Sequence, residues 1–155
     1  YPLSDFFYPH IVDYYSSQGD WDKALAYTDS ALIADSTNVT VLLAKSTLLL
    51  NTADYDGCCA ISSRLTKSQP ELATAWLNAG LAKFNQGVSL DKNLQSSAKA
   101  RRQILQLYTE ALPFLEKYRS LQPNAKDKWG LPLYTIYLNL NKGKEFDEID
   151  KLIGK

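Results

Sequence analysis

The sequence predicts an all-α protein, built from antiparallel helical hairpins that stack on one another as an α-solenoid. Three observations predict this fold class. Residue types recur 34 residues apart, apolar side chains recur at helical spacing within each repeat, and the chain shows neither sustained alternation nor an Asn-Gly hairpin turn. A single hairpin cannot bury both of its faces, so we expect neighbouring hairpins to supply one another's core.

The period is clearest around two aromatic residues. Trp21 and Tyr55 lie 34 residues apart, and each stands between two aspartates. Ala24 and Cys58, both small, keep the same spacing. Aromatic and small positions therefore share one period, and we expect a single domain over residues 1–155. Its units are predicted at residues 5–38, 39–72, 73–123 and 124–155.

The first unit shows how each hairpin is expected to form. Apolar residues at helical spacing, among them Phe7 and Tyr15, predict its first helix. A polar turn follows, with Gly19 at the bend. Either Asp20 or Asp22 can cap the second helix, because both precede its apolar stripe.

The later units repeat this pattern. Turns between their helices are expected at residues 51–54 and 141–143, where polar residues interrupt the apolar spacing. Pro70 and Pro123 mark the ends of the second and third units, since proline rarely continues a helix.

The third unit differs from the others by an insertion at about residues 88–107. This segment is poor in helix breakers, so we expect it to lengthen both helices of the hairpin, with a bend between Asp91 and Ser97. A disordered loop is the alternative. Antiparallel helices approach closely only where side chains are short, so Gly80 is expected to face the region of Ala111.

Charge is balanced overall but unevenly distributed. The formal net charge is zero, with −5 on residues 1–72 and +5 on residues 73–155. A neutral total argues against nucleic acid as a partner. An acidic half joined to a basic half favours weak head-to-tail self-association.

No segment predicts membrane insertion, because no apolar run approaches the ~20 residues that a membrane helix needs. The start of the chain lacks the pattern of a signal peptide. The chain begins at Tyr1 and contains no Met, so we expect a processed form or a fragment of a longer protein.

Residues that could carry chemistry are few, and no enzymatic activity, metal site or cofactor is predicted. Cys58 and Cys59 are adjacent, which suits neither an ordinary disulfide nor a metal site, and we expect small core residues. His10 is the only histidine, and no ligand cluster lies at a suitable spacing, so we expect it on the surface.

The repeat resembles the tetratricopeptide (TPR) family. The resemblance is carried by the period, by Trp76 with Gly80 four residues later, and by the run from Gly19 to Ala24. Two positions depart from the family pattern: Ser36 stands where proline usually ends a repeat, and Ser46 stands where glycine or alanine is usual. The stretch from Ala111 to Arg119 is, more narrowly, similar to TPR proteins of Bacteroides-type bacteria.

The resemblance implies a concave inner face, lined by the first helix of each hairpin. Carried over by register, the partner-binding positions are Thr40, Leu43, Thr47, Asn51, Leu77, Asn78, Leu81, Phe84 and Asn85. The leucines and the phenylalanine would make this groove more apolar than a free surface. Either a partner segment or another part of this chain, such as the long third hairpin, would then cover them. The asparagines would hydrogen-bond the backbone of a bound segment.

Lys99, Arg101 and Arg102 form the densest basic cluster and are candidate contacts for an anion. The alternative is an exposed helix face whose long side chains cover apolar surface. Interleaved aromatic residues, which single-stranded nucleic acid would need, are missing here.

The function predicted from these features is a non-catalytic scaffold that binds a protein or peptide segment in its concave groove. Two alternatives stay open: a structural role through self-association, and an accessory domain that binds glycans in a bacterial envelope. The family resemblance favours the periplasm or cell envelope as location, with the cytoplasm as the alternative.

Overall fold

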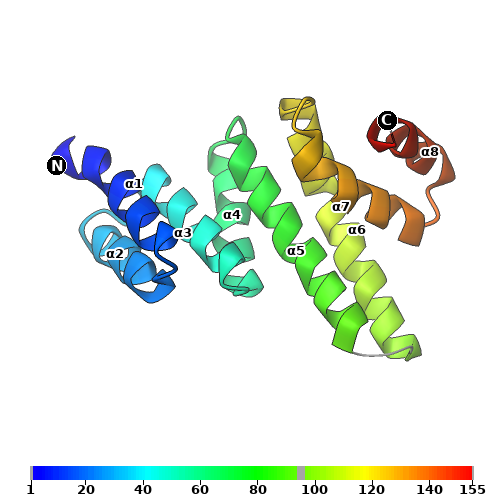
Figure 1. Ribbon diagram of the computed structural model, residues 1–155, viewed down its shortest axis with the longest axis horizontal. Coiled ribbons are helices and arrows are strands. Elements are labelled where there is room, and N and C mark those ends of the chain that lie inside the picture. The colour runs from blue at the N-terminus through cyan, green and yellow to red at the C-terminus, as the bar shows by residue number, and fades with distance from the viewer. Residues whose placement is uncertain (1, 94–96, 155) are drawn as a thin grey trace.

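The computed structural model describes residues 2–93 and 97–154, and in that part of the chain it contains helices and no strand (Figure 1). The all-α prediction is confirmed. The helices are α1 (Pro2–Ser17), α2 (Trp21–Ala34), α3 (Val39–Asn51), α4 (Tyr55–Ser68), α5 (Ala73–Asn93), α6 (Ala98–Leu121), α7 (Lys126–Asn139) and α8 (Gly143–Ile153).

The helices pair in chain order as hairpins, and the hairpins follow one another along the long axis of the molecule (Figure 1). Each odd-numbered helix packs against the next odd-numbered helix, so that α1, α3, α5 and α7 form a continuous row. Each even-numbered helix also contacts the odd-numbered helix that follows it. The result is a TPR-like stack of antiparallel hairpins, as the 34-residue period predicts.

The turns within three hairpins share a left-handed backbone. Gly19, Ala53 and Asn141 have φ angles of 72°, 62° and 54°. They lie in the predicted turns, and Gly19 and Ala53 stand one repeat period apart. Glycine adopts this conformation without strain, whereas an alanine in it costs roughly 1–2 kcal/mol.

Aspartate and asparagine side chains cap the first turns of three helices, α2, α3 and α4. The Asp20 carboxylate accepts the backbone N–H of Lys23, so the choice between Asp20 and Asp22 falls on Asp20. Asp54 caps α4 in the same way, and Asn38 caps α3. These side chains satisfy N–H groups that have no partner inside the helix.

The insertion lengthens the third hairpin. Its helices α5 and α6 have 21 and 24 residues, whereas the others have 11 to 16 (Figure 1). The helical prediction is therefore confirmed for residues 88–93 and 98–107. Ser97 caps α6 by accepting the N–H of Ala100, while residues 94–96, at the centre of the predicted bend, lie outside the described residues.

Glycines bring α5 and α6 together, but the predicted partner of Gly80 is wrong. A Cβ atom on Gly80 would lie 2.7 Å from Cγ of Leu115, so Gly80 faces Leu115 rather than Ala111, one helical turn away. A Cβ atom on Gly87 would lie 2.6 Å from a ring carbon of Tyr108. Both distances are too short for any larger residue without movement, so these two positions set the spacing of the long hairpin.

The core is divided among the hairpin junctions. The largest cluster joins the third and fourth hairpins and includes Leu115, Leu133 and Ile136. Smaller clusters join the first hairpin to the second, around Val12, and the second to the third, around Cys58. Cys58 is fully buried and Cys59 half-buried, so the prediction of core cysteines holds best for Cys58.

Replacing Ala53 with glycine is expected to raise the free energy of unfolding by about 0.5–1 kcal/mol, because it removes a strained left-handed alanine. Urea denaturation followed by circular dichroism would measure the change. The matched control is Gly19→Ala, which introduces the same strain and should lower stability by about 1 kcal/mol. A less stable Ala53→Gly variant would contradict the strain argument.

The Cys58 thiol should be inert in the folded protein. Burial raises its pKa to about 11, and its sulfur lies 3.6 Å from the carbonyl oxygen of Asn78. A Cys59→Ser variant should therefore resist a maleimide at pH 8 until it is unfolded, whereas Cys58→Ser should react while folded. Because the folded pKa is raised, stability from this thiol is present below the ordinary thiol pKa and is lost as the pH rises through 11. Rapid labelling of folded Cys59→Ser would contradict this assignment.

Candidate functional site

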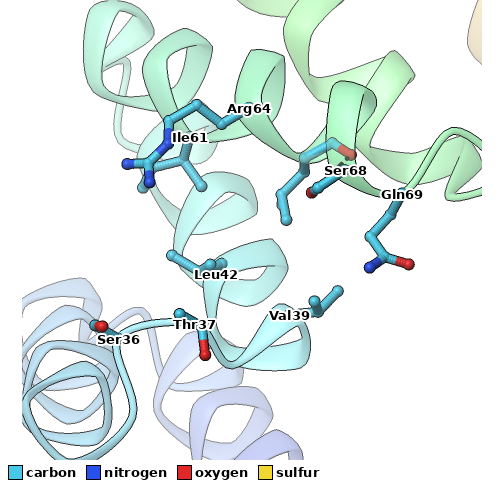
Figure 2. A pocket seen from close by; sticks show the side chains of 9 residues that line it. Ser36, Thr37, Val39, Leu42, Ile61, Arg64, Ser68 and Gln69 are labelled. Atoms are coloured by element: carbon cyan, nitrogen blue, oxygen red, sulfur yellow. Dashed lines mark hydrogen bonds between the residues drawn. The ribbon is translucent and has the colours of Figure 1, made fainter.

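A cleft of about 310 Å³ opens beside the connection between α2 and α3 (Figure 2). One wall is the start of α3, with Val39 and Leu42, and the facing wall is α4, with Ile61 and Leu65. These four side chains make an apolar floor. The connection itself forms the third wall, through Ser36 and Thr37.

The connection is held in shape by local hydrogen bonds. The Asp35 carboxylate accepts both the backbone N–H and the hydroxyl of Thr37, at 3.1 and 2.9 Å. Asn38 then caps α3 by accepting the N–H of Val41 at 3.1 Å. This tight turn stands where the family usually has a proline, and it sets Ser36 and Thr37 at the edge of the cleft.

The rim of the cleft is polar. Arg64, Ser68 and Gln69 come from the end of α4 and its C-cap (Figure 2). Arg64 is exposed and forms no ion pair with any carboxylate in residues 2–93 and 97–154. An apolar floor with one available guanidinium suits a ligand that combines an apolar group with an anionic one.

The sequence did not single out these residues as a site. Ile61, Arg64 and Ser68 recur at spacings of three and four, which places them on one face of α4. That signal is present in the sequence. Only the packing of α4 against α3 shows that this face lies opposite Ser36 and Thr37.

The predicted apolar groove is wrong for two of its main residues. Leu77 and Phe84 are buried in the core shared by α5, α6 and α7, and the Phe84 ring stacks on that of Tyr108 at 5.6 Å. The alternative, burial by the chain's own third and fourth hairpins, holds for both. An odd-numbered helix meets the next hairpin on this face, so the register that suggested a groove marks a packing surface instead.

Asn78 is also buried rather than available to a partner. Its amide nitrogen donates to the hydroxyls of Ser46 and Thr47, at 2.9 and 3.0 Å. Ser46 is itself fully buried and donates to the carbonyl of Leu43. The departure of Ser46 from the family pattern therefore has a structural role, since its hydroxyl helps tie α3 to α5.

The other predicted groove positions keep some access to solvent. Thr40 and Asn51 are exposed, while Leu43, Thr47, Leu81 and Asn85 are half-buried. Leu81 also packs against the main core cluster. That these residues line a groove for a partner stays a prediction. The face on which they lie is more polar than the sequence suggested.

One small cavity does open between two odd-numbered helices. It measures about 80 Å³ and is lined by Pro9 and Asp13 of α1 and by Thr40 and Ala44 of α3, among others. Thr40 is one of the groove positions predicted from the repeat register. The cavity has room for no more than a small side chain.

The basic cluster lies at the start of α6. Lys99, Arg101 and Arg102 are all exposed. Arg101 donates to the side-chain oxygen of Asn139 at 2.9 Å, which links the long hairpin to α7. The anion contact proposed from the sequence stays a prediction for Lys99 and Arg102, and Arg101 has a structural partner.

A polar recess between α4, α5 and α6 also went unpredicted. Lys83 and Glu110 form a 3.0 Å ion pair across it, and Gln86 donates to Asp56 at 2.7 Å. The hydrogen bond from Lys83 lowers the pKa of Glu110, and the same bond raises the pKa of Lys83. These charges neutralise one another, so the recess offers a ligand less than the cleft does.

The tryptophans pack into the structure rather than forming a flat platform for sugar rings. Trp129 is buried and donates to the carbonyl of Gln122, and Trp76 donates to that of Pro70. Trp21 packs against the core of the first hairpin.

Two further searches covered the described residues. Residues 2–93 and 97–154 contain no group of three or more His, Cys, Asp or Glu side chains that could hold a metal ion. None of the described helices has the length and apolar character to cross a membrane.

Comparisons with known proteins add little to this description. No family model matches the chain, and no curated protein matches its sequence. One matching solved structure, titled "MamA MSR-1 C2", is 15% identical over 97% of this chain and 97% of that chain, with a TM-score of 0.45. The narrower likeness to Bacteroides-type proteins has no support in these comparisons.

Removing the Asn78 amide is expected to destabilise the protein. In an Asn78→Ala variant, the buried Ser46 hydroxyl and the half-buried Thr47 hydroxyl lose a donor and a void replaces the side chain, so the free energy of unfolding should fall by about 1–3 kcal/mol. Urea denaturation would measure it. Asn85→Ala, on the half-buried part of the same helix, is the control and should change stability by less than about 0.5 kcal/mol. Equal effects would contradict the bridging role of Asn78.

Proposed function

We propose that this chain is a non-catalytic interaction module that binds a segment of a partner protein. The observation that carries the proposal is the cleft beside the α2–α3 connection, with its apolar floor and, on its rim, Arg64, which pairs with no carboxylate among the described residues. Its volume of about 310 Å³ lies at the small end of ligand pockets, which suits a few side chains of a peptide better than a large cofactor.

The lining indicates the chemistry of the bound segment. An apolar side chain would pack against Leu42, Ile61 and Leu65, and a nearby carboxylate would pair with Arg64. Ser68 and Gln69 carry polar side chains that can hydrogen-bond the backbone of an extended segment. The proposed partner segment is therefore short and combines apolar with acidic residues.

The inner face is the second candidate surface for the same function. Leu43 and Leu81 are only half-buried there, and Asn51 and Asn85 offer side-chain amides beside them. This surface is less apolar than the cleft floor, because Leu77 and Phe84 lie in the core.

Selection of binders from a random peptide library would test the proposal. We expect selected peptides to share an apolar residue close to an Asp or Glu. Arg64→Glu should weaken their binding about 10- to 100-fold, the equivalent of about 1.5–3 kcal/mol for a hydrogen bond to a charged group. Ile61→Ser should also weaken binding, because it removes apolar floor.

Matched controls separate the candidate surfaces. Arg102→Glu makes the same charge change at an exposed position on α6, away from the cleft, and should leave binding unchanged. Peptides that tolerate Arg64→Glu and Ile61→Ser but lose affinity with Leu43→Ser would place the site on the inner face. Oligosaccharides that bind where no peptide does would contradict the proposal in favour of a glycan-binding role.

A further inference from the structure

Two pairs of positions recur from one odd-numbered helix to the next, and the two residues of each pair lie seven positions apart. The front pair faces the preceding hairpin, and the back pair faces the following one. Both pairs recur 34 residues further along the chain in the next repeat, and the spacing is longer between the third and fourth units because of the insertion. The front pairs are Phe7 and Tyr14, Val41 and Leu48, Ala75 and Ala82, and Trp129 and Ile136. The back pairs from α3 onward are Leu43 and Leu50, Leu77 and Phe84, and Leu131 and Leu138.

Inside the array, residues of a back pair lie in the same core cluster as residues of the next front pair. Leu77 and Phe84 of α5 share one core cluster with Trp129 and Ile136 of α7. Leu50 of α3 packs against the cluster that contains Ala82 of α5. The front pairs on α3, α5 and α7 are all at most 3% exposed, because each has a preceding hairpin.

The last back pair is exposed. Leu131 and Leu138 of α7 keep 68% and 53% of their surface accessible, whereas their counterparts Leu77 and Phe84 keep 8% each. The described part of the chain holds no hairpin after α8 that could cover them. These leucines therefore have the register of buried core residues and the exposure of surface residues.

The first front pair is exposed in the same way. Phe7 and Tyr14 of α1 are 51% and 62% exposed, although the equivalent Val41 and Leu48 of α3 are buried. The two exposed pairs lie at opposite ends of the molecule, since α1 and α7 belong to the terminal hairpins (Figure 1).

We infer that a second copy of this chain covers each exposed pair, through a head-to-tail contact between α7 of one copy and α1 of the next. Leu131 and Leu138 would pack against Phe7 and Tyr14, much as Leu77 and Phe84 share a core cluster with Trp129 and Ile136 at the junction of the third and fourth hairpins. The stack of hairpins would then continue from one copy into the next.

Charge supports a second copy as the occupant. Residues 1–38 carry six aspartates and one lysine, so the whole −5 of the acidic half lies in the first hairpin. On α7 and just after it, Lys128 and Lys142 stand three residues before Leu131 and four after Leu138, at the two ends of the exposed stripe. The last hairpin as a whole is nearly neutral, since residues 124–155 carry six lysines and five Asp or Glu residues. Two acidic first hairpins repel one another, whereas a first hairpin meets no such repulsion at the last hairpin, so head-to-tail contact is favoured over contact between two front ends.

The geometry makes the association open-ended. Each copy uses one surface to bind ahead and a different surface to bind behind, so the interface is heterologous and does not close on itself in a pair. Oligomers larger than dimers are therefore expected as the protein concentration rises.

Sedimentation equilibrium of the chain over a range of concentrations would test this inference. We expect the weight-average mass to rise beyond that of a dimer. The back-end variant Leu131→Ser/Leu138→Ser and the front-end variant Tyr14→Asp should each be monomeric, with a dissociation constant raised at least about tenfold, which corresponds to about 1.4 kcal/mol. The control Ile33→Ser removes an apolar side chain that is 88% exposed on α2, outside both pairs, and should associate like the wild type.

A mixture of the two disabled variants supplies the decisive measurement. Each variant keeps one intact end, so an equimolar mixture should form a dimer of twice the monomer mass and nothing larger. Such a dimer would also show that both variants fold. The inference is overturned if the wild type stays monomeric at its highest soluble concentration, if either variant associates like the wild type, or if the mixture remains monomeric.

Discussion

The packing of each hairpin against the next is the interaction on which the rest of the structure depends. Each core cluster contains residues from two neighbouring hairpins, because a single hairpin cannot bury both of its faces. This constraint explains why the core is divided along the chain. It also explains why apolar residues remain exposed on α1 and α7, where the described residues include no further hairpin that packs against these positions.

The third hairpin supplies more buried apolar residues than any other hairpin of the described chain, because its helices are the longest. Gly80 and Gly87 bring α5 and α6 close together, and Tyr108 and Leu115 fill the space that the absent side chains leave. The extended part projects beyond the neighbouring helices (Figure 1). Arg101 and Arg119 then join this hairpin to the fourth, through Asn139 and Glu148.

Openings form where the even-numbered helices do not touch. In the described chain α2 and α4 make no direct helix–helix contact, and the cleft lies beside the connection that leads from α2 to α3. On the row of odd-numbered helices the packing is tighter, and Asn78 bridges α3 to α5 with hydrogen bonds to two hydroxyls. The cleft that we propose as a binding site therefore lies on a different surface from the one that repeat register suggests.

The sequence by itself determined the helices, their turns and caps, and the lengthening of the third hairpin. These features depend on local chemistry, such as Gly19 in a left-handed turn, Asp20 and Asp54 at helix starts, and apolar residues at helical spacing. Only the tertiary structure decided which apolar residues are covered. Leu77 and Leu131 have the same residue type and the same repeat register, yet the first is buried and the second is exposed. The reason is that burial depends on the presence of a following hairpin, which no local pattern encodes.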